Sequence, residues 1–297
     1  MRLTPHAIAA AVALLALGLL VLGSAAVAVR AYSAELADFR PSNHPVSRPS
    51  GVAGLDLLED VSFRAGDSRI AGWYRPPAKP GSPVVVLLHG SGADRSQVVP
   101  QAALLARRGY GLLLFDWPGH GESEGRVLLG APERAALEAG LDFLQKEKAV
   151  RRVGVFGFSL GAYIGLQVAA ADERVAVLAV EGAPSDLEEQ IYYEYRRWSP
   201  VAPWGALLAL RQVGVDLSGP RPLDLVARLG PRPIFLIAGL ADPVIPASMS
   251  QSLFDAARGP RELWLVAGGG HGDAREREPE EYARRLVDFF ARTLPAD

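Results

Sequence analysis

One short stretch, VGVFGFSLGAYIGL at Val153–Leu166, constrains the fold of this chain more than any other. An apolar run at 153–156 ends in GFSLG at 157–161, and small residues at helical spacing come next. This order predicts a strand, a sharp turn with Ser159 at its apex, and a helix. Glycine is expected two positions before and after the serine, because larger side chains there would collide with adjoining elements.

The helix predicted after this turn has one bare face. Gly161, Gly165 and Ala169 follow one another at intervals of four residues, so they share that face. A face with almost no side chains can pack closely against a sheet. The alternative is an ordinary strand-to-helix turn with an incidental serine, and only the rest of the chain distinguishes the two.

Composition narrows the possible functions. A chain of 297 residues suits one large α/β domain or two small ones, and 49% hydrophobic with 22% charged residues argues against disorder. A net charge of −2 lacks the excess of positive charge that is typical of nucleic-acid-binding proteins. The absence of cysteine excludes disulfides, thiolate metal sites and a cysteine nucleophile, but it does not indicate a compartment. The excess of arginine over lysine is typical of a GC-rich bacterial genome.

The amino terminus carries an uncharged apolar run, Ala7–Val29. As a helix this run would be roughly 35 Å long, enough to cross a hydrocarbon core of about 30 Å. We favour an uncleaved single-span anchor over residues 1–30, in a bacterial inner membrane. The alternative is a signal peptide cleaved near Ala26-Val27-Ala28, which would leave a secreted or periplasmic protein.

The flanking charges do not settle the orientation of such an anchor. Arg2 lies before the apolar run, and Arg30, Arg40 and Arg48 lie after it. The positive-inside rule therefore weakly favours a cytoplasmic location for the catalytic domain. Short bacterial leaders more often export the domain behind them, so the side stays open.

Three regions lie beyond the apolar run. Residues 31–55 are rich in proline, serine and glycine and predict a linker. Residues 56–297 alternate strand and helix patterns, which predicts a mostly parallel sheet covered on both faces. Residues 185–228 interrupt this alternation with crowded aromatic residues and predict a small cap over the site, with a short helix at 206–210.

The residues suited to chemistry come directly after predicted strands. These residues are His89-Gly90-Ser91, Ser159, Asp242 and His271. Ligands of doubly wound sheets bind at the carboxyl ends of the strands, so these side chains should share one edge. A serine nucleophile needs a general base, which in turn needs a group to orient it. We predict Ser159 as nucleophile, His271 as base and Asp242 as acid, in that chain order.

Two backbone N–H groups are candidates for an oxyanion hole. Leu160 is next to the serine at the positive end of a helix, and Ser91 lies in the turn after His89-Gly90. The remaining histidines at strand ends, His89 and His120, are interpreted as structural.

Several other residues are rivals for these roles. Ser91 and Ser123 lack the strand-turn-helix context of a nucleophile. Glu181 and Asp186 also lie at or after a strand end and are alternative acids, whereas Asp273 is too close to His271 in sequence. The aromatic residues at 192–204 are interpreted equally well as packing of the cap and as the lining of an acyl pocket.

These motifs together resemble the α/β-hydrolase superfamily over residues 60–295. HGSGADR resembles its oxyanion loop, FDWPGHGES the loop after the next strand, and GFSLGA the nucleophile turn; LIAGLADPVIP and GGGHGD resemble the acid and base loops. Asp116, in the second of these motifs, is then a loop-stabilising residue. The leader and linker lie outside the resemblance. Within the superfamily, the chain is similar to bacterial serine hydrolases of the esterase, acylglycerol-lipase and prolyl-oligopeptidase-like groups.

The resemblance implies hydrolysis of carboxylic esters or lipid-like acyl groups through an acyl-enzyme, with no metal or organic cofactor. The expected partners are an acyl substrate and a membrane bound through residues 7–29, with no nucleic acid. A peptidase or amidase using the same triad is the alternative, and a non-catalytic scaffold is a weaker one. The sequence does not indicate the physiological substrate or the oligomeric state.

Overall fold

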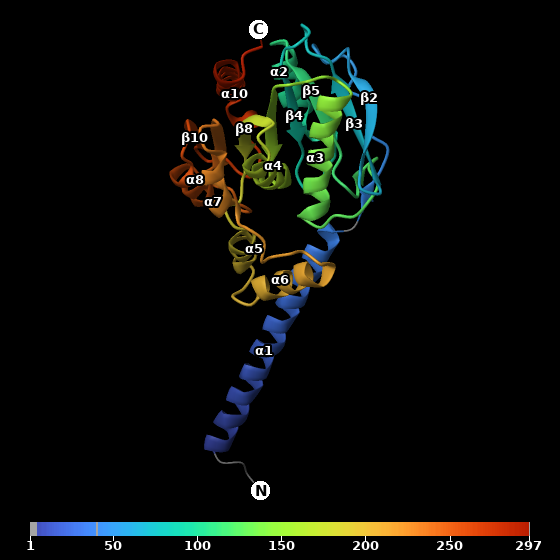
Figure 1. The fold of residues 1–297 in the computed structure, drawn as a ribbon. Helices are drawn as coiled ribbons and strands as arrows, with labels where there is room; N and C mark the ends of the chain where they lie inside the picture. Colours follow the sequence, from blue (N-terminus) through green and yellow to red (C-terminus); the bar gives the residue numbers. More distant parts are fainter. Residues whose placement is uncertain (1–4, 40, 297) are drawn as a thin grey trace.

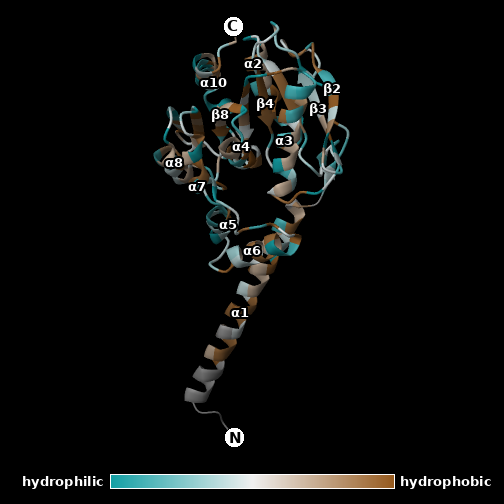
Figure 2. Cartoon of the chain, viewed as in Figure 1, coloured by the Kyte–Doolittle hydropathy of each residue, from teal (hydrophilic) through white to brown (hydrophobic). Residues whose placement is uncertain are grey.

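The computed structural model describes residues 5–39 and 41–296 of the chain (Figure 1). One long helix, α1 (Pro5–Asp38), projects from an α/β domain, and its N-terminal end lies far from the sheet. Arg2 and Arg40, which enter the orientation argument, lie outside the described residues. Figure 2 shows few hydrophilic residues along the projecting part of α1.

Helix α1 meets the requirements of a membrane span by length and composition. Its apolar part runs over Val12–Ala37, and the most apolar stretch is not buried within the structure. Leucines such as Leu14 and Leu22 are 70% and 68% exposed. A signal sequence near the amino terminus meets the same requirements, so the helix alone does not distinguish an anchor from a leader.

The domain is built on an eight-stranded sheet in the order β10-β9-β8-β7-β4-β5-β3-β2. The strands are β2 (Glu59–Ala65), β3 (Ser68–Arg75), β4 (Val84–Leu88), β5 (Gly111–Phe115), β7 (Val153–Phe158), β8 (Val175–Glu181), β9 (Ile234–Gly239) and β10 (Arg261–Val266). The pairs from β5 through β10 are parallel, and β2 and β3 are antiparallel. Strands β4 and β5 are buried along their whole length, as their continuous Val and Leu runs predict.

Helices cover both faces of the sheet and create two apolar cores. One core contains residues of α3 (Ala131–Lys146), α4 (Leu160–Ala171) and α8 (Ala247–Ala256). The other contains residues of α2 (Val99–Ala106) and α10 (Pro279–Thr293). This arrangement confirms the predicted α/β-hydrolase fold class. Short elements complete the domain: β1 (Ser42–Asn43), β6 (His120–Gly121), α7 (Pro222–Leu225), α9 (Ala274–Arg277) and two 3₁₀ turns (Arg95–Val98 and Val226–Leu229).

The glycines around Ser159 are required by close backbone approaches. A Cβ on Gly161 would lie 2.4 Å from the Leu88 carbonyl oxygen, and one on Gly157 would lie 2.3 Å from the Gly161 carbonyl oxygen. Ser159 itself has φ +52°, a conformation that costs a non-glycine residue about 1–3 kcal/mol. The predicted strand, sharp turn and helix are therefore all present, and the sheet holds the turn in its strained form.

The predicted cap contains more helix than the sequence pattern indicates. Residues 185–228 form α5 (Leu187–Arg196), α6 (Ala202–Val213) and α7. The sequence pattern predicted a short helix at 206–210, within α6, and a helix at 223–229, which overlaps α7, but α5 was missed. Helix α5 begins where Asp186 accepts a hydrogen bond from the Glu189 N–H at 2.9 Å, and its apolar side packs on α6.

The linker is shorter than predicted, because α1 continues through Asp38 instead of ending near residue 30. The last turns of α1 pack against the cap: Ala31 is fully buried and Ala34 lies in the same cluster as Ala206 and Leu210. The prediction of an irregular segment from residue 31 was wrong because these stabilising contacts come from a part of the chain distant in sequence.

A pair of glycine variants tests whether the close approach of Gly161 to the Leu88 carbonyl is required for stability. Gly161→Ala should destabilise the protein by about 2 kcal/mol, since its Cβ meets backbone rather than a movable side chain. Gly165→Ala is the matched control, because its Cβ would lie 3.4 Å from Leu88 and Val155 side-chain carbons, an ordinary contact. The control should be neutral or stabilising by up to about 1 kcal/mol.

Unfolding of both full-length variants in detergent micelles, monitored by circular dichroism, gives the comparison. Equal stability of the two variants would contradict the assignment of Gly161 as a required contact.

Candidate active site

The chemistry-bearing residues collect at the carboxyl edge of the sheet. The chain passes from β4 outward to β5 on one side and from β7 to β8 on the other, so the strand order reverses between β4 and β7. Ser91 lies after β4 and Ser159 after β7, which places them on either side of that reversal. Open α/β sheets form their binding crevices at such points.

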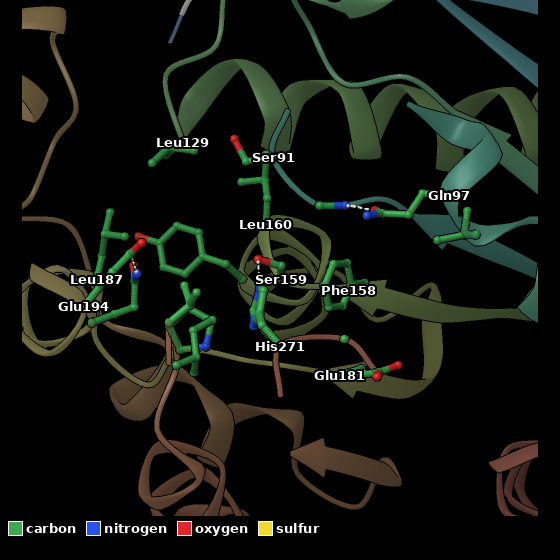
Figure 3. A pocket seen from close by; sticks show the side chains of 18 of the residues that line it. Ser91, Gln97, Leu129, Phe158, Ser159, Leu160, Glu181, Leu187, Glu194 and His271 are labelled. Carbon is green, nitrogen blue, oxygen red and sulfur yellow. Dashed lines mark hydrogen bonds between the residues drawn. The ribbon is translucent and has the colours of Figure 1, made fainter. Parts of the chain in front are cut away.

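Three side chains form one hydrogen-bonded chain there. His271 Nε2 lies 3.1 Å from Ser159 Oγ, and His271 Nδ1 lies 2.7 Å from Asp242 Oδ2. Figure 3 shows the imidazole directly beneath the serine hydroxyl. The structure thus brings together Ser159, Asp242 and His271 from three separate loops, in the order that the sequence analysis predicted.

The carboxylate of Asp242 is fixed in position by its own loop. Its Oδ1 accepts hydrogen bonds from the N–H groups of Val244 and Ile245, at 2.8 and 2.9 Å. The side chain is almost fully buried, whereas His271 keeps a fifth of its side chain exposed. Two N–H donors hold one oxygen of this buried carboxylate, and its other oxygen bonds the imidazole. The opposite ring nitrogen, Nε2, is then free to face the Ser159 hydroxyl.

The turn after β4 runs next to the serine. A Cβ on Gly90 would lie 3.4 Å from the Ser159 Cβ, so the next residue, Ser91, faces the same space. Ser91, Leu160 and Ser159 all line one cavity, and in Figure 3 Leu160 lies between Ser91 and Ser159. Leu160 is the first residue of α4, and the first N–H groups of a helix have no partner within it. The N–H groups of both residues stay candidates for an oxyanion hole.

Two buried histidines hold this turn, as the sequence interpretation expected. His89 Nδ1 bonds the Gly90 carbonyl oxygen at 2.7 Å, and its Nε2 accepts the Trp117 N–H at 3.1 Å. His120 Nε2 accepts the Gly92 N–H at 3.1 Å. Burial lowers the pKa of His89 to about 3 and also lowers the pKa of His120, so both rings stay neutral.

The other carboxylates near the site have different partners. Asp116 is buried and bonds the backbone and guanidinium of Arg95, which ties the loop after β5 to the turn before α2. Asp186 caps α5, and Asp273 accepts the Gly270 N–H at 2.7 Å. None of these three carboxylates has a hydrogen bond to His271 among the residues described.

Glu181, the other rival acid, lies at the end of β8 and belongs to a separate network. Its Oε2 accepts the Tyr282 hydroxyl at 2.8 Å, and Tyr282 in turn accepts from Gln101 Nε2 at 3.0 Å. One oxygen of Glu181 and one of Gln101 are buried with no hydrogen-bond partner in the described structure. Burial raises the pKa of Glu181 to about 7.

A cavity of about 550 Å³ contains the serine and the imidazole. Both apolar and polar side chains line each side of it. In Figure 3, Leu129 and Leu187 lie on one side of Ser159, and Gln97 and Glu181 lie on the other. Glu194 lies on the side of Leu187, and Phe158 lies on the side of Gln97. Ile191 and Gln101 also line the cavity.

Two lining residues come from an unexpected place. Glu35 and Phe39 belong to the carboxyl end of α1 and the residue after it, and both line the cavity. Local sequence pattern offered no signal for this, because the segment contains no motif and was predicted to be a linker. In the described part of the chain, no cluster of three or more His, Asp or Glu side chains could hold a metal ion.

Comparison with known sequences identifies relatives over most of the chain. The profile of the alpha/beta hydrolase fold matches residues 83–206. An uncharacterized protein of Mycobacterium tuberculosis is 32% identical over 240 residues, which cover 78% of each chain. YfhR of Escherichia coli K12, also uncharacterized, is 28% identical over 248 residues, covering 80% of this chain and 81% of YfhR.

Solved structures share the same architecture. A Pyrococcus furiosus esterase superposes with a TM-score of 0.70 at 22% identity, covering 85% of this chain and 99% of the esterase. An acylaminoacyl peptidase of Pyrococcus horikoshii gives a TM-score of 0.64 at 20% identity, over 81% of this chain and 42% of the peptidase. Profile, relatives and fold agree: the chain belongs to the α/β-hydrolase superfamily.

Proposed function

We propose that this protein is a serine hydrolase that cleaves carboxylic esters or lipid-like acyl groups through an acyl-enzyme intermediate. The observation that carries the proposal is the hydrogen-bonded chain Ser159–His271–Asp242, which lies in a cavity with the serine on a strained turn. A serine hydroxyl becomes a useful nucleophile when a base accepts its proton and an acid orients that base.

The proposed reaction has two stages. His271 Nε2 takes the proton of Ser159 Oγ as the oxygen attacks the acyl carbon, and the N–H groups of Ser91 and Leu160 stabilise the oxyanion. The protonated imidazole, balanced by Asp242, then gives its proton to the leaving alcohol. Water, activated by the same base, attacks the acyl-enzyme and releases the acid. These steps need no metal or organic cofactor.

The shape of the cavity supports an ester with an apolar acyl part. Leu129, Leu187 and Ile191 offer apolar contacts for the acyl chain, although the polar pair Gln190 and Glu194 also lines the cavity. Gln97 and Glu181 offer hydrogen bonds to a polar leaving group. A peptidase or amidase would use the same triad, and matched nitrophenyl esters and nitroanilides separate the two activities.

The proposed domain organisation places the hydrolase domain at residues 56–297, with a cap at 185–228 and α1 as a membrane anchor. Packing supports an uncleaved helix, since a Cβ on Gly205 of α6 would lie 2.0 Å from the Ala28 carbonyl oxygen. Cleavage by a signal peptidase after Ala28 would remove the α1 side of this contact and leave Gly205 of α6 without its partner. Secretion after cleavage is the alternative that this packing argues against.

Labelling with a fluorophosphonate probe tests the nucleophile. We expect the full-length chain to be labelled and Ser159→Ala to lose all labelling, because the probe phosphonylates only an activated serine. Ser91→Ala, which removes a rival hydroxyl from the same cavity and keeps the backbone N–H, should still be labelled. Mass spectrometry of the labelled peptide locates the site, and a probe adduct outside residues 157–161 would refute the assignment.

Kinetics of acid-loop variants test the orienting carboxylate. Asp242→Asn should lower kcat for a nitrophenyl ester by about 10³–10⁴-fold, since an amide neither fixes the imidazole tautomer nor balances its charge. Asp186→Asn, which alters a helix cap and an ion pair with Arg221, should lower kcat less than tenfold. A loss for Asp186→Asn as large as that for Asp242→Asn would show that the acid is assigned wrongly.

The buried Glu181 should make stability depend on pH. Its folded pKa of about 7 exceeds its ordinary value of 4.5, because burial disfavours the charged form. The free energy of unfolding should therefore fall as pH rises from about 4.5 to 7, and the loss is complete above that window. The total change is on the order of 3 kcal/mol.

Glu181→Gln removes this titration. Relative to the wild type, the variant should gain stability between pH 5 and pH 8 in denaturant titrations. Asp273→Asn is the control, because Asp273 is only partly buried and its pKa is lowered by its hydrogen bond to Arg277, so it does not titrate in this range. The same stability difference at both pH values would contradict the raised pKa.

A further inference from the structure

Helix α1 forms part of the cavity wall as well as the projecting segment. Glu35 is 5% exposed, and its Oε2 accepts the hydroxyl of Tyr195 on α5 at 2.8 Å. Glu35 and Phe39 line the same cavity as Ser159. A helix that only tethered a domain would have no reason to bury a carboxylate beside the proposed active site.

The cap is joined to α1 at several points. Gly205 allows α6 to cross α1 against the Ala28 carbonyl, where any Cβ would clash. The Tyr32 hydroxyl donates to Gln212 Oε1, and the Arg30 guanidinium lies 5.3 Å from the centre of the Trp198 ring. The uncharged stretch of α1 ends at Val29, so these contacts hold α6 at the level where the first charged residue, Arg30, appears.

One face of α6 is apolar and exposed at this level. Trp204 is 65% exposed and Leu208 is 58% exposed, and they lie one helical turn apart. Arg211 continues the same face and is exposed. In Figure 1, α6 crosses α1 between its projecting part and the α/β domain. Tryptophan beside arginine is typical of helices at the boundary between water and lipid.

Positive charge accompanies this apolar face. Arg30, Arg196, Arg197 and Arg211 are all exposed on α1, α5 and α6 or next to them. Glu188 and Glu189 are in the first turn of α5, at the opposite end from Arg196, whereas Glu194 is in the last turn and is hydrogen-bonded to Gln190 at 2.8 Å. Such basic groups beside a membrane span attract anionic lipid headgroups, at about 1 kcal/mol for each arginine near the surface.

We propose that α1 and the cap form an entrance to the Ser159 cavity at the membrane surface, with Trp204 and Leu208 inserted at the boundary of the bilayer that α1 crosses. An acyl lipid then enters the cavity from the bilayer beside the end of α1, where Glu35 and Phe39 line the wall, with its chain against Leu129, Leu187 and Ile191. This inference rests on the proposed hydrolase function and names its substrate class as membrane-resident acyl esters. The occupant of the exposed face is the lipid surface.

The test uses the full-length chain reconstituted in phosphatidylcholine vesicles containing 20% phosphatidylglycerol. Hydrolysis of a long-chain fluorogenic acylglycerol within the vesicles is compared with hydrolysis of soluble nitrophenyl acetate. The double variant Trp204→Ser/Leu208→Ser should lose about tenfold or more of the vesicle activity and less than twofold of the soluble activity. Leu57→Ser is the matched control, since Leu57 is 61% exposed on the α/β domain, and it should change neither activity.

A second measurement does not depend on catalysis. Brominated phosphatidylcholine should quench tryptophan fluorescence in the wild type, and Trp204→Phe should remove much of that quenching. If the wild type shows quenching but hydrolyses neither ester, the contact of Trp204 with the bilayer is supported and the proposed hydrolase function is refuted. Wild-type vesicle activity in the double variant, or absence of quenching at Trp204, would overturn the membrane entrance. A halved mass of the double variant in detergent would also overturn it, because a second copy would then cover the face.

Discussion

The contact between Gly161 and the Leu88 carbonyl is the constraint on which the proposed site depends. It lets α4 begin directly against β4, with Ser159 held at a positive φ on the turn before it. This strain persists because two neighbouring strands are buried along their length and cannot move aside. The serine, the first N–H of α4 and the turn after β4 thereby meet in one small space. The loops that carry Asp242 and His271 then need only reach the same edge of the sheet to meet the serine.

Buried polar groups around this space hold the loops instead of reacting. His89 and His120 are kept neutral by burial and bond the turn that carries Ser91. Arg95 and Asp116 join two further loops. Apart from the buried Arg95 Nε, which has no hydrogen-bond partner in the described structure, these groups bond to the backbone or to a charged partner, which stabilises one loop conformation. An oxyanion site requires such preorganised donors, because they need not rearrange during the reaction.

Much of the fold could be predicted because its signals are local. Apolar runs marked the central strands, glycine spacing marked the turn, and helical periodicity marked most covering helices. The errors were also physical in origin. Helix α5 was missed because its apolar residues are interpretable only against α6, and the end of α1 was misplaced because the cap stabilises it. Capping and packing determine where a helix ends, and the hydrophobic periodicity of one segment gives no information about either.

The sequence by itself determined the order of strands and helices, the superfamily and the residues predicted to carry chemistry, because each depends on patterns within a few neighbouring positions. Tertiary structure decided which of these residues meet. Ser159 and His271 are 112 residues apart in the chain and Glu35 and Tyr195 are 160 apart, yet both pairs form hydrogen bonds. The role of α1 as a wall of the cavity belongs to this second category. Contacts over such separations arise from the packing of the whole chain, so no local pattern contains them.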